Sequence, residues 1–237
     1  MTVLRSALFT LALVLITPPY ALLALATFPL PRLARYRVIA GWCWIVVRMA
    51  RALCGIRWRI EGREHLPAQP AVILSKHQSA WETLAYHEIF PPQSYLLKRE
   101  LLWIPFFGWG LALMSPIAID RSRGRAALRA LARRGKARLA QGFWVVVFPE
   151  GTRIAPGERH KYQLGGAWLA TLCKVPVVPV AHNAGLLWPR HAFLKRPGTI
   201  TVRIGAPIET AGRDPETVNR LAEQWIEQQQ DALCPRS

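Results

Sequence analysis

A histidine and a glutamate five residues apart, His77 and Glu82, form the first pair in the sequence that could move a proton. The apolar run at residues 71–74 predicts a strand that ends just before His77, and a helix is predicted from residue 81 onward. Side chains five residues apart on one helix point about 140° away from each other, since each residue turns by about 100°. The two can therefore meet only if His77 precedes the helix and Glu82 lies in its first turn. Glu82 would then accept a hydrogen bond from one ring nitrogen and leave the other as a general base. The simpler alternative is a surface histidine near a glutamate.

A second candidate stretch, FPEGTR at residues 148–153, follows the apolar strand predicted at residues 144–148. Gly151 permits close backbone approach, Thr152 offers a hydroxyl and Arg153 carries a planar guanidinium suited to phosphate or carboxylate. Ligand sites of open α/β sheets collect at the carboxyl ends of the strands, so we expect this stretch and the histidine at one edge. An ordinary turn with a surface arginine is the alternative.

A third stretch, SPIAIDR at residues 115–121, predicts a strand that ends in an acid–base pair. Eight lysines and arginines occupy residues 121–138, with no acidic residue between them and Glu150, and apolar residues lie between them at helical spacing. This pattern predicts a basic amphipathic helix. A solvated surface is the plain interpretation, and binding of anionic lipid headgroups or of an acidic partner is the functional one.

Strands and helices alternate from about residue 56 onward, and this pattern predicts the frame that positions these residues. Strands separated by helices favour an α/β fold with a largely parallel central sheet flanked by helices. Two prolines in VPVVPV at residues 175–180 exclude an ordinary central strand with full pairing there. Strands are predicted at Ile56–Glu61, 71–74, 95–97, Ile117–Ile119, 144–148, 177–180 and 200–204, and helices at 81–90, 125–141, 164–173 and Pro215–Leu233.

The first 55 residues predict a membrane-anchoring segment ahead of a domain at residues 56–237. No charged residue occurs from residue 6 to residue 31, a run that would span about 39 Å as a helix and could cross a bilayer. Pro18 and Pro19 interrupt the run, because proline removes a backbone donor. It could form one kinked span, two short arms within one leaflet, or a cleaved signal peptide.

A second apolar stretch, residues 38–47, contains two tryptophans and lies between arginines. It is too short to cross a bilayer and predicts a helix in the headgroup region, or else a core helix. The excess of arginine after residue 31 favours the cytoplasmic side. We therefore expect a protein of the cell inner membrane whose folded domain faces the cytoplasm.

The composition excludes several classes of protein. The 237 residues are 51% hydrophobic and 19% charged, which excludes a disordered chain. With 31 Lys and Arg against 14 Asp and Glu, the formal charge is +17, which indicates an anionic partner. Nucleic acid is excluded, because no nucleic-acid-binding motif accompanies the charge. No metal-ligand spacing is present, and a disulfide scaffold is excluded because the cysteines are dispersed: Cys43, Cys54, Cys173 and Cys234.

The order of these motifs resembles that of the 1-acyl-glycerol-3-phosphate acyltransferase family. The resemblance covers about residues 55–210 and rests on the histidine and acid, on IDR, FPEGTR and VPVVPV, and on KREL at 98–101 and PFFGW at 105–109. It implies transfer of a fatty acyl group from acyl-CoA or acyl-carrier protein to the 2-hydroxyl of lysophosphatidic acid, giving phosphatidic acid without a further cofactor. A related acyltransferase that uses another lysophospholipid or a lyso-aminolipid is the alternative.

The resemblance also implies a role for each site residue. The family usually has Asp where this sequence has Glu82, so a shifted helix or a folded-back rotamer must accommodate one extra methylene. A thioester is a reactive donor, so a base and positioning are the main requirements, with an apolar slot for the chain. Residues 101–109 and 111–114 could line that slot or belong to the core. His77 would be the general base and Glu82 its orienting partner, and Glu150, Gly151, Thr152 and Arg153 would bind the glycerol-phosphate end with help from Arg121.

Overall fold

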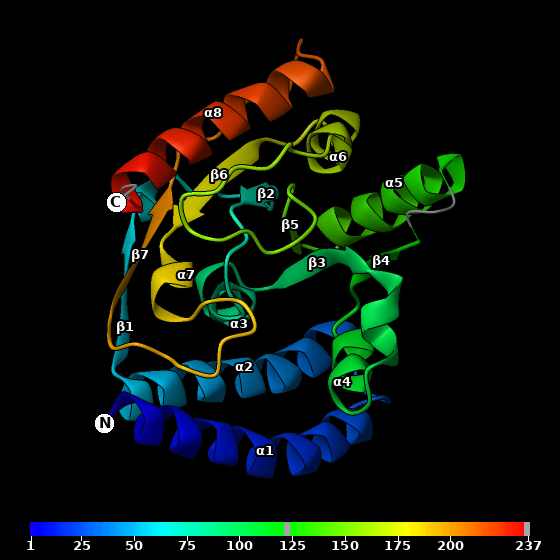
Figure 1. Cartoon of the computed structure of the whole chain (residues 1–237). Coiled ribbons are helices and arrows are strands. Elements are labelled where there is room, and N and C mark those ends of the chain that lie inside the picture. Colours follow the sequence, from blue (N-terminus) through cyan, green and yellow to red (C-terminus); the bar gives the residue numbers. More distant parts are fainter. Residues whose placement is uncertain (121–123, 235–237) are drawn as a thin grey trace.

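The computed structural model describes residues 1–120 and 124–234. The strands among them are β1 (Ile56–Glu61), β2 (Val72–Ser75), β3 (Gln93–Lys98), β4 (Ile117–Ile119), β5 (Trp144–Val147), β6 (Val177–His182) and β7 (Gly198–Ile204). They form one sheet with the order β1-β7-β6-β2-β5-β3-β4 (Figure 1). Only β6 and β7 pair antiparallel among these neighbours, so the sheet is largely parallel, as predicted.

Helices cover both faces of this sheet. The described helices are α1 (Thr2–Ala26), α2 (Arg32–Cys54), α3 (Trp81–Ile89), α4 (Phe107–Leu113), α5 (Arg125–Ala140), α6 (Gly165–Cys173), α7 (Ala184–Leu187) and α8 (Pro215–Leu233), with 3-10 turns at Arg63–His65 and Arg99–Trp103. In Figure 1, α5, α6 and α8 lie on one face, and α3 lies on the other with α2 and α1 beneath it. The flanked α/β architecture expected from the sequence is confirmed. α4, α7 and the 3-10 turns were not predicted, because they are too short to show a helical repeat of apolar residues.

The central strands β2, β5 and β6 supply both cores, because successive side chains point to opposite faces. Ile73 and Val146 pack in the core that lies towards α2 and α3. Their chain neighbours Leu74 and Val147 pack in the core beneath α6 and α8. The sheet edge from which β2 and β5 lead into the loops is therefore held from both sides.

The N-terminal helices pack on the domain rather than standing apart from it. α1 is continuous through Pro18 and Pro19 and curves along α2 (Figure 1). Phe9 of α1 is fully buried, with its ring 5.2 Å from that of Trp188. α1 is long and apolar enough to cross a membrane, and only 17% of its most apolar 18-residue stretch is buried. α2 is far longer than the predicted apolar stretch, and it ends at Gly55, whose backbone is left-handed (φ 72°). The boundary expected there, between the anchoring segment and the folded domain, stays a prediction.

The proline-rich run forms an interior strand with interrupted pairing. On the β2 side β6 pairs from Val177 to Val180, but on the β7 side regular pairing begins only at Val180. The carbonyl of Pro179 points to that side and accepts from the N–H of Gly205, just past the end of β7. The missing donor of Pro179 thus falls where no ladder partner is required. The expected loss of full pairing is confirmed, and the strand is nevertheless central.

Candidate active site

His77 and Glu82 meet at the carboxyl end of β2. His77 lies in the turn before α3, and Glu82 is the second residue of that helix. The Nδ1 atom of His77 is 2.9 Å from Oε1 of Glu82. The same oxygen accepts the backbone N–H groups of Gln78 at 2.9 Å and Ser79 at 2.7 Å. The glutamate side chain therefore folds back over the start of its own helix, and this conformation accommodates the extra methylene.

The environment of Glu82 keeps its carboxylate charged. The side chain is fully buried, and burial acts to raise its pKa. The imidazoles of His182 and His77 and the N–H of Ser79 outweigh burial, so the pKa of Glu82 lies below its ordinary value. An anionic Glu82 accepts from Nδ1–H of His77, which leaves Nε2 to accept a proton. The ring of Phe148 stacks on the imidazole at 4.0 Å and fixes its plane.

Glu150 lies behind the site rather than on its surface. Its buried Oε2 accepts the backbone N–H of His77 at 2.9 Å, and its Oε1 is 2.7 Å from Nζ of Lys76. Burial raises the pKa of Glu150 to about 7 against the opposing effect of Lys76. Gly151, the next residue, has a φ of 72° that favours glycine and turns the chain towards the cavity.

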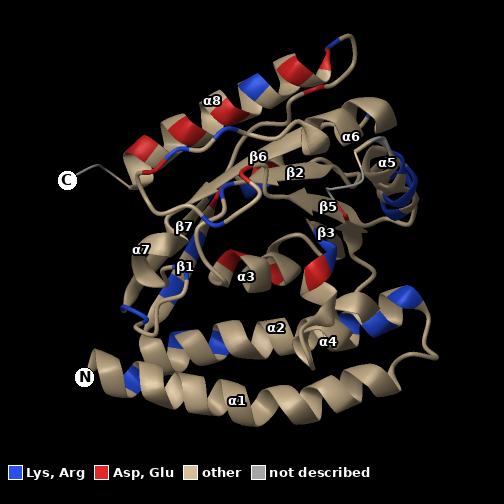
Figure 2. Ribbon diagram, turned by 45° about the vertical axis from the view of Figure 1, so that its right-hand side comes forward, with Lys and Arg blue, Asp and Glu red and all other residues tan. Residues whose placement is uncertain are grey.

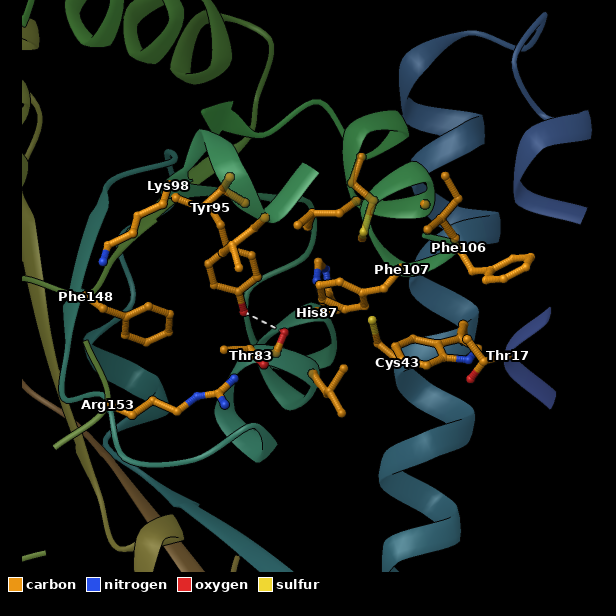
Figure 3. Close-up of a pocket in the computed structure, with 18 of the residues that line it drawn as sticks. Thr17, Cys43, Thr83, His87, Tyr95, Lys98, Phe106, Phe107, Phe148 and Arg153 are labelled. Atoms are coloured by element: carbon orange, nitrogen blue, oxygen red, sulfur yellow. Dashed lines mark hydrogen bonds between the residues drawn. The ribbon is translucent and has the colours of Figure 1, made fainter. Parts of the chain in front are cut away.

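The loop residues after Glu150 line a cavity of about 390 Å³ together with His77. Gly151, Thr152 and Arg153 lie at its polar end. Figure 3 shows Arg153, Lys98 and Phe148 on one side of this space and Thr17 and Cys43, from α1 and α2, on the other. The lining also includes Leu101, Phe106, Phe107, Gly110, Leu111 and Met114, most of them in the segments predicted as an acyl-chain slot.

The cavity wall contains cations that no sequence motif assigned to the site. Lys98 lies at the end of β3, and Arg190 lies in the irregular segment between α7 and β7. Nη1 of Arg190 donates to the backbone carbonyl of Arg153 at 2.5 Å. Nε of Arg153 is buried and has no hydrogen-bond partner within the described part of the chain. Lys98 stands in the KREL motif, but no period or motif marks Arg190.

The predicted role of Arg121 lies outside the described residues and stays a prediction. The basic helix that follows is present as α5. Two of its arginines are used internally, since Arg134 donates to the carbonyl of Ala118 and Arg138 to that of Ser115, both at 2.7 Å. Arg129, Arg133 and Lys136 of α5 are exposed and form a basic surface on the outside of the molecule (Figure 2). Within residues 1–120 and 124–234, no group of three or more His, Cys, Asp or Glu is arranged to hold a metal ion.

Comparisons with known proteins agree with this geometry. The profile of the acyltransferase family matches residues 57–183, which include both dyad residues and the FPEGTR loop. A 1-acyl-sn-glycerol-3-phosphate acyltransferase of Pseudomonas aeruginosa is 47% identical over 210 residues, covering 87% of this chain and 82% of that protein. The chain belongs to the 1-acyl-sn-glycerol-3-phosphate acyltransferase family. The resemblance seen in the motifs is thereby confirmed.

More distant members of the acyltransferase family share the same core. The alpha 1-acyl-sn-glycerol-3-phosphate acyltransferase of Mus musculus is 34% identical over 178 residues, covering 73% of this chain and 62% of that protein. The crystal structure of the 1-acyl-sn-glycerophosphate acyltransferase of Thermotoga maritima matches with a TM-score of 0.79 at 22% identity. That match covers 100% of this chain and 99% of the other, so the fold includes the two N-terminal helices.

Proposed function

We propose that this acyltransferase transfers a fatty acyl group from acyl-CoA or acyl-carrier protein to the 2-hydroxyl of lysophosphatidic acid, giving phosphatidic acid. The observation that carries the proposal is the 2.9 Å contact between Nδ1 of His77 and Oε1 of Glu82, located where an apolar cavity meets Arg153. A held imidazole suits a base, a guanidinium suits a phosphate, and an apolar cavity suits an acyl chain.

In the proposed reaction, Nε2 of His77 takes the proton of the 2-hydroxyl as its oxygen attacks the thioester carbonyl. The new C–O bond forms, the tetrahedral adduct collapses and the C–S bond breaks. The imidazolium returns its proton to the departing thiolate, so no net proton is gained or lost. Glu82 acts by stabilising the imidazolium and by holding the tautomer that presents Nε2 as the base.

The cations of the cavity wall support a phosphate monoester as the acceptor's head group. Arg153 and Arg190 are joined through the carbonyl of Arg153, and Lys98 lines the same cavity. Such a group of cations matches the charge of a phosphate monoester better than that of a zwitterionic lyso-lipid. Thr152 offers a hydroxyl beside them.

The exposed apolar surface supports a membrane location, which we propose to be the inner membrane with the domain on its cytoplasmic side. α1 is almost free of charged residues (Figure 2). Leu4, Leu11 and Leu15 of α1 are 56–65% exposed, and Trp103 near α4 is 70% exposed. The cavity reaches α1 and α2, so an acyl chain would enter from the lipid side. Anionic lipids, and an acidic acyl-carrier protein as donor, are the proposed partners of the basic surface on α5.

The test is an acyl-transfer assay with the full chain in mixed micelles. Both thioester donors are offered with lysophosphatidic acid, lysophosphatidylglycerol, lysophosphatidylcholine and a lyso-aminolipid, and products are identified by mass spectrometry. We expect phosphatidic acid as the main product. Faster turnover of any other acceptor would replace the proposed substrate.

A further inference from the structure

The residues on either side of His77 point away from the cavity. The N–H of Lys76 pairs with the carbonyl of Val180, so the chain is still extended there and side chains alternate. The side chains of Lys76 and Gln78 are both buried. Both reach the same helix, α8, on the face of the sheet opposite α3.

Lys76 is held by the carboxylate of Glu227 on α8. Its Nζ lies 2.8 Å from Oε1 of Glu227 and 2.7 Å from Oε1 of Glu150. The hydroxyl of Tyr162 donates to the same Glu227 oxygen at 2.9 Å. A buried ammonium is stable only where carboxylates and hydrogen bonds surround it, so these acceptors fix the position of the Lys76 side chain.

Gln78 is held in the same way by Gln230, three residues further along α8. Its Nε2 donates to Oε1 of Gln230 at 2.7 Å, and its Oε1 accepts the N–H of Gly185 at 3.2 Å. Nε2 of Gln230 in turn donates to the carbonyl of His182 at 2.9 Å. Residues three apart lie on one face of a helix, so a single turn of α8 contacts both neighbours of the histidine.

We propose that Glu227 and Gln230 of α8 position the imidazole of His77 for catalysis. The inference rests on the proposed function, in which His77 is the base. Oε1 of Glu82 accepts from the backbone of Gln78 and Ser79 as well as from the imidazole, so a shift of this turn disturbs all three bonds together. Displacements of about 1 Å at a catalytic group cost up to about a hundredfold in rate. Neither α8 residue lines the cavity, so both act through Lys76 and Gln78.

The experiment compares four α8 variants of the full chain in kcat, in KM for both substrates and in thermal unfolding. Glu227→Gln leaves Lys76 with one carboxylate, and Gln230→Ala removes both bonds of that amide. Gln228→Ala is the exposed control on the same turn of α8. Ile226→Val weakens the buried face of α8 and leaves Glu227 and Gln230 unchanged. We expect Glu227→Gln and Gln230→Ala to lower kcat about tenfold with KM changed less than about twofold. We expect Ile226→Val to lower the melting temperature at unchanged kcat.

A fifth variant, Glu227→Asp, keeps the charge and is expected to retain more activity than Glu227→Gln. Wild-type kcat in folded Glu227→Gln and Gln230→Ala would overturn the inference, and so would an equal loss in Ile226→Val. If Glu227→Gln fails to fold, Gln230→Ala decides. His77→Ala is measured in parallel: full activity there contradicts the proposed base itself, whereas an inactive His77→Ala with fully active α8 variants contradicts only the positioning role.

Discussion

Oε1 of Glu150 lies 2.7 Å from Nζ of Lys76, and both side chains are almost completely buried. The same ammonium also faces Glu227, whose other oxygen lies 3.5 Å from Nε of Arg159. Burial raises the pKa of Glu150 to about 7, and the charge of Glu227 acts in the same direction, against the opposing effect of Lys76. Protonated Glu150 would still occupy its place beside the N–H of His77.

This raised pKa predicts a pH dependence of stability. A carboxyl whose pKa is higher in the folded chain than in the unfolded chain stabilises the fold below about pH 4.5, and that contribution is lost as pH rises through about 7. Glu150→Gln removes this titration. The melting temperature of the variant relative to wild type is therefore expected to rise between pH 5 and pH 8, as measured by thermal unfolding in detergent. A difference that is constant with pH would contradict the shift.

Removing the imidazole is expected to abolish most turnover. His77→Ala should lower kcat at least about a hundredfold, the usual contribution of a general base. The side chain is partly exposed to the cavity, so the fold should survive, which circular dichroism can check. Near-normal turnover in the folded variant would remove His77 from the mechanism.

Glu82 variants separate charge from reach. Glu82→Gln keeps the length but loses the charge that stabilises the imidazolium, so kcat should fall by about a hundredfold with little change in KM. Glu82→Asp keeps the charge but is one methylene shorter in a turn where Oε1 accepts three N–H groups. We expect activity below wild type and well above Glu82→Gln. Equal kcat of Glu82→Gln and wild type across pH would show that another group orients His77.

Arginines at the polar end of the cavity should act on the acceptor alone. Arg153→Ala is expected to raise KM for lysophosphatidic acid about tenfold, the scale of a lost charged hydrogen bond, with KM for the donor unchanged. Arg190→Ala should raise the same KM by less, and the exposed Arg196→Ala, outside the cavity lining, should leave it unchanged. A rise in donor KM would reassign these residues to the thioester.

Gly110 offers a test of the acyl-chain path. It lines the cavity, and a Cβ placed on it has open space around it. Gly110→Leu should therefore fold and shorten the space available to the chain. When donors of different chain length compete, the variant should prefer shorter chains, and its turnover of the longest donor should fall about tenfold. An unchanged length preference would place the acyl chain elsewhere.

Much of the frame was predictable from local patterns. β-branched runs predicted the central strands, and the spacing of His77 and Glu82 required the turn-to-helix placement that the structure has. The contacts that α8 makes with the neighbours of His77 were not predictable. Glu227 and Gln230 lie on an ordinary amphipathic helix about 150 residues from Lys76 and Gln78, and no local pattern reports a contact at that separation. Glu150 shows the same limit, because the sequence of its loop does not indicate which residues line the cavity and which lie behind it.

Residues 1–26 are more than a tether. Thr17, Tyr20 and Ala21 of α1 are part of the cavity lining, and Phe9 fills the space beside Trp188. Cutting the chain after α1 to obtain a soluble enzyme would open one side of the cavity and uncover the aromatic side chain of Trp188. A water-soluble form has to be made by redesigning the outer face of α1, not by shortening the protein.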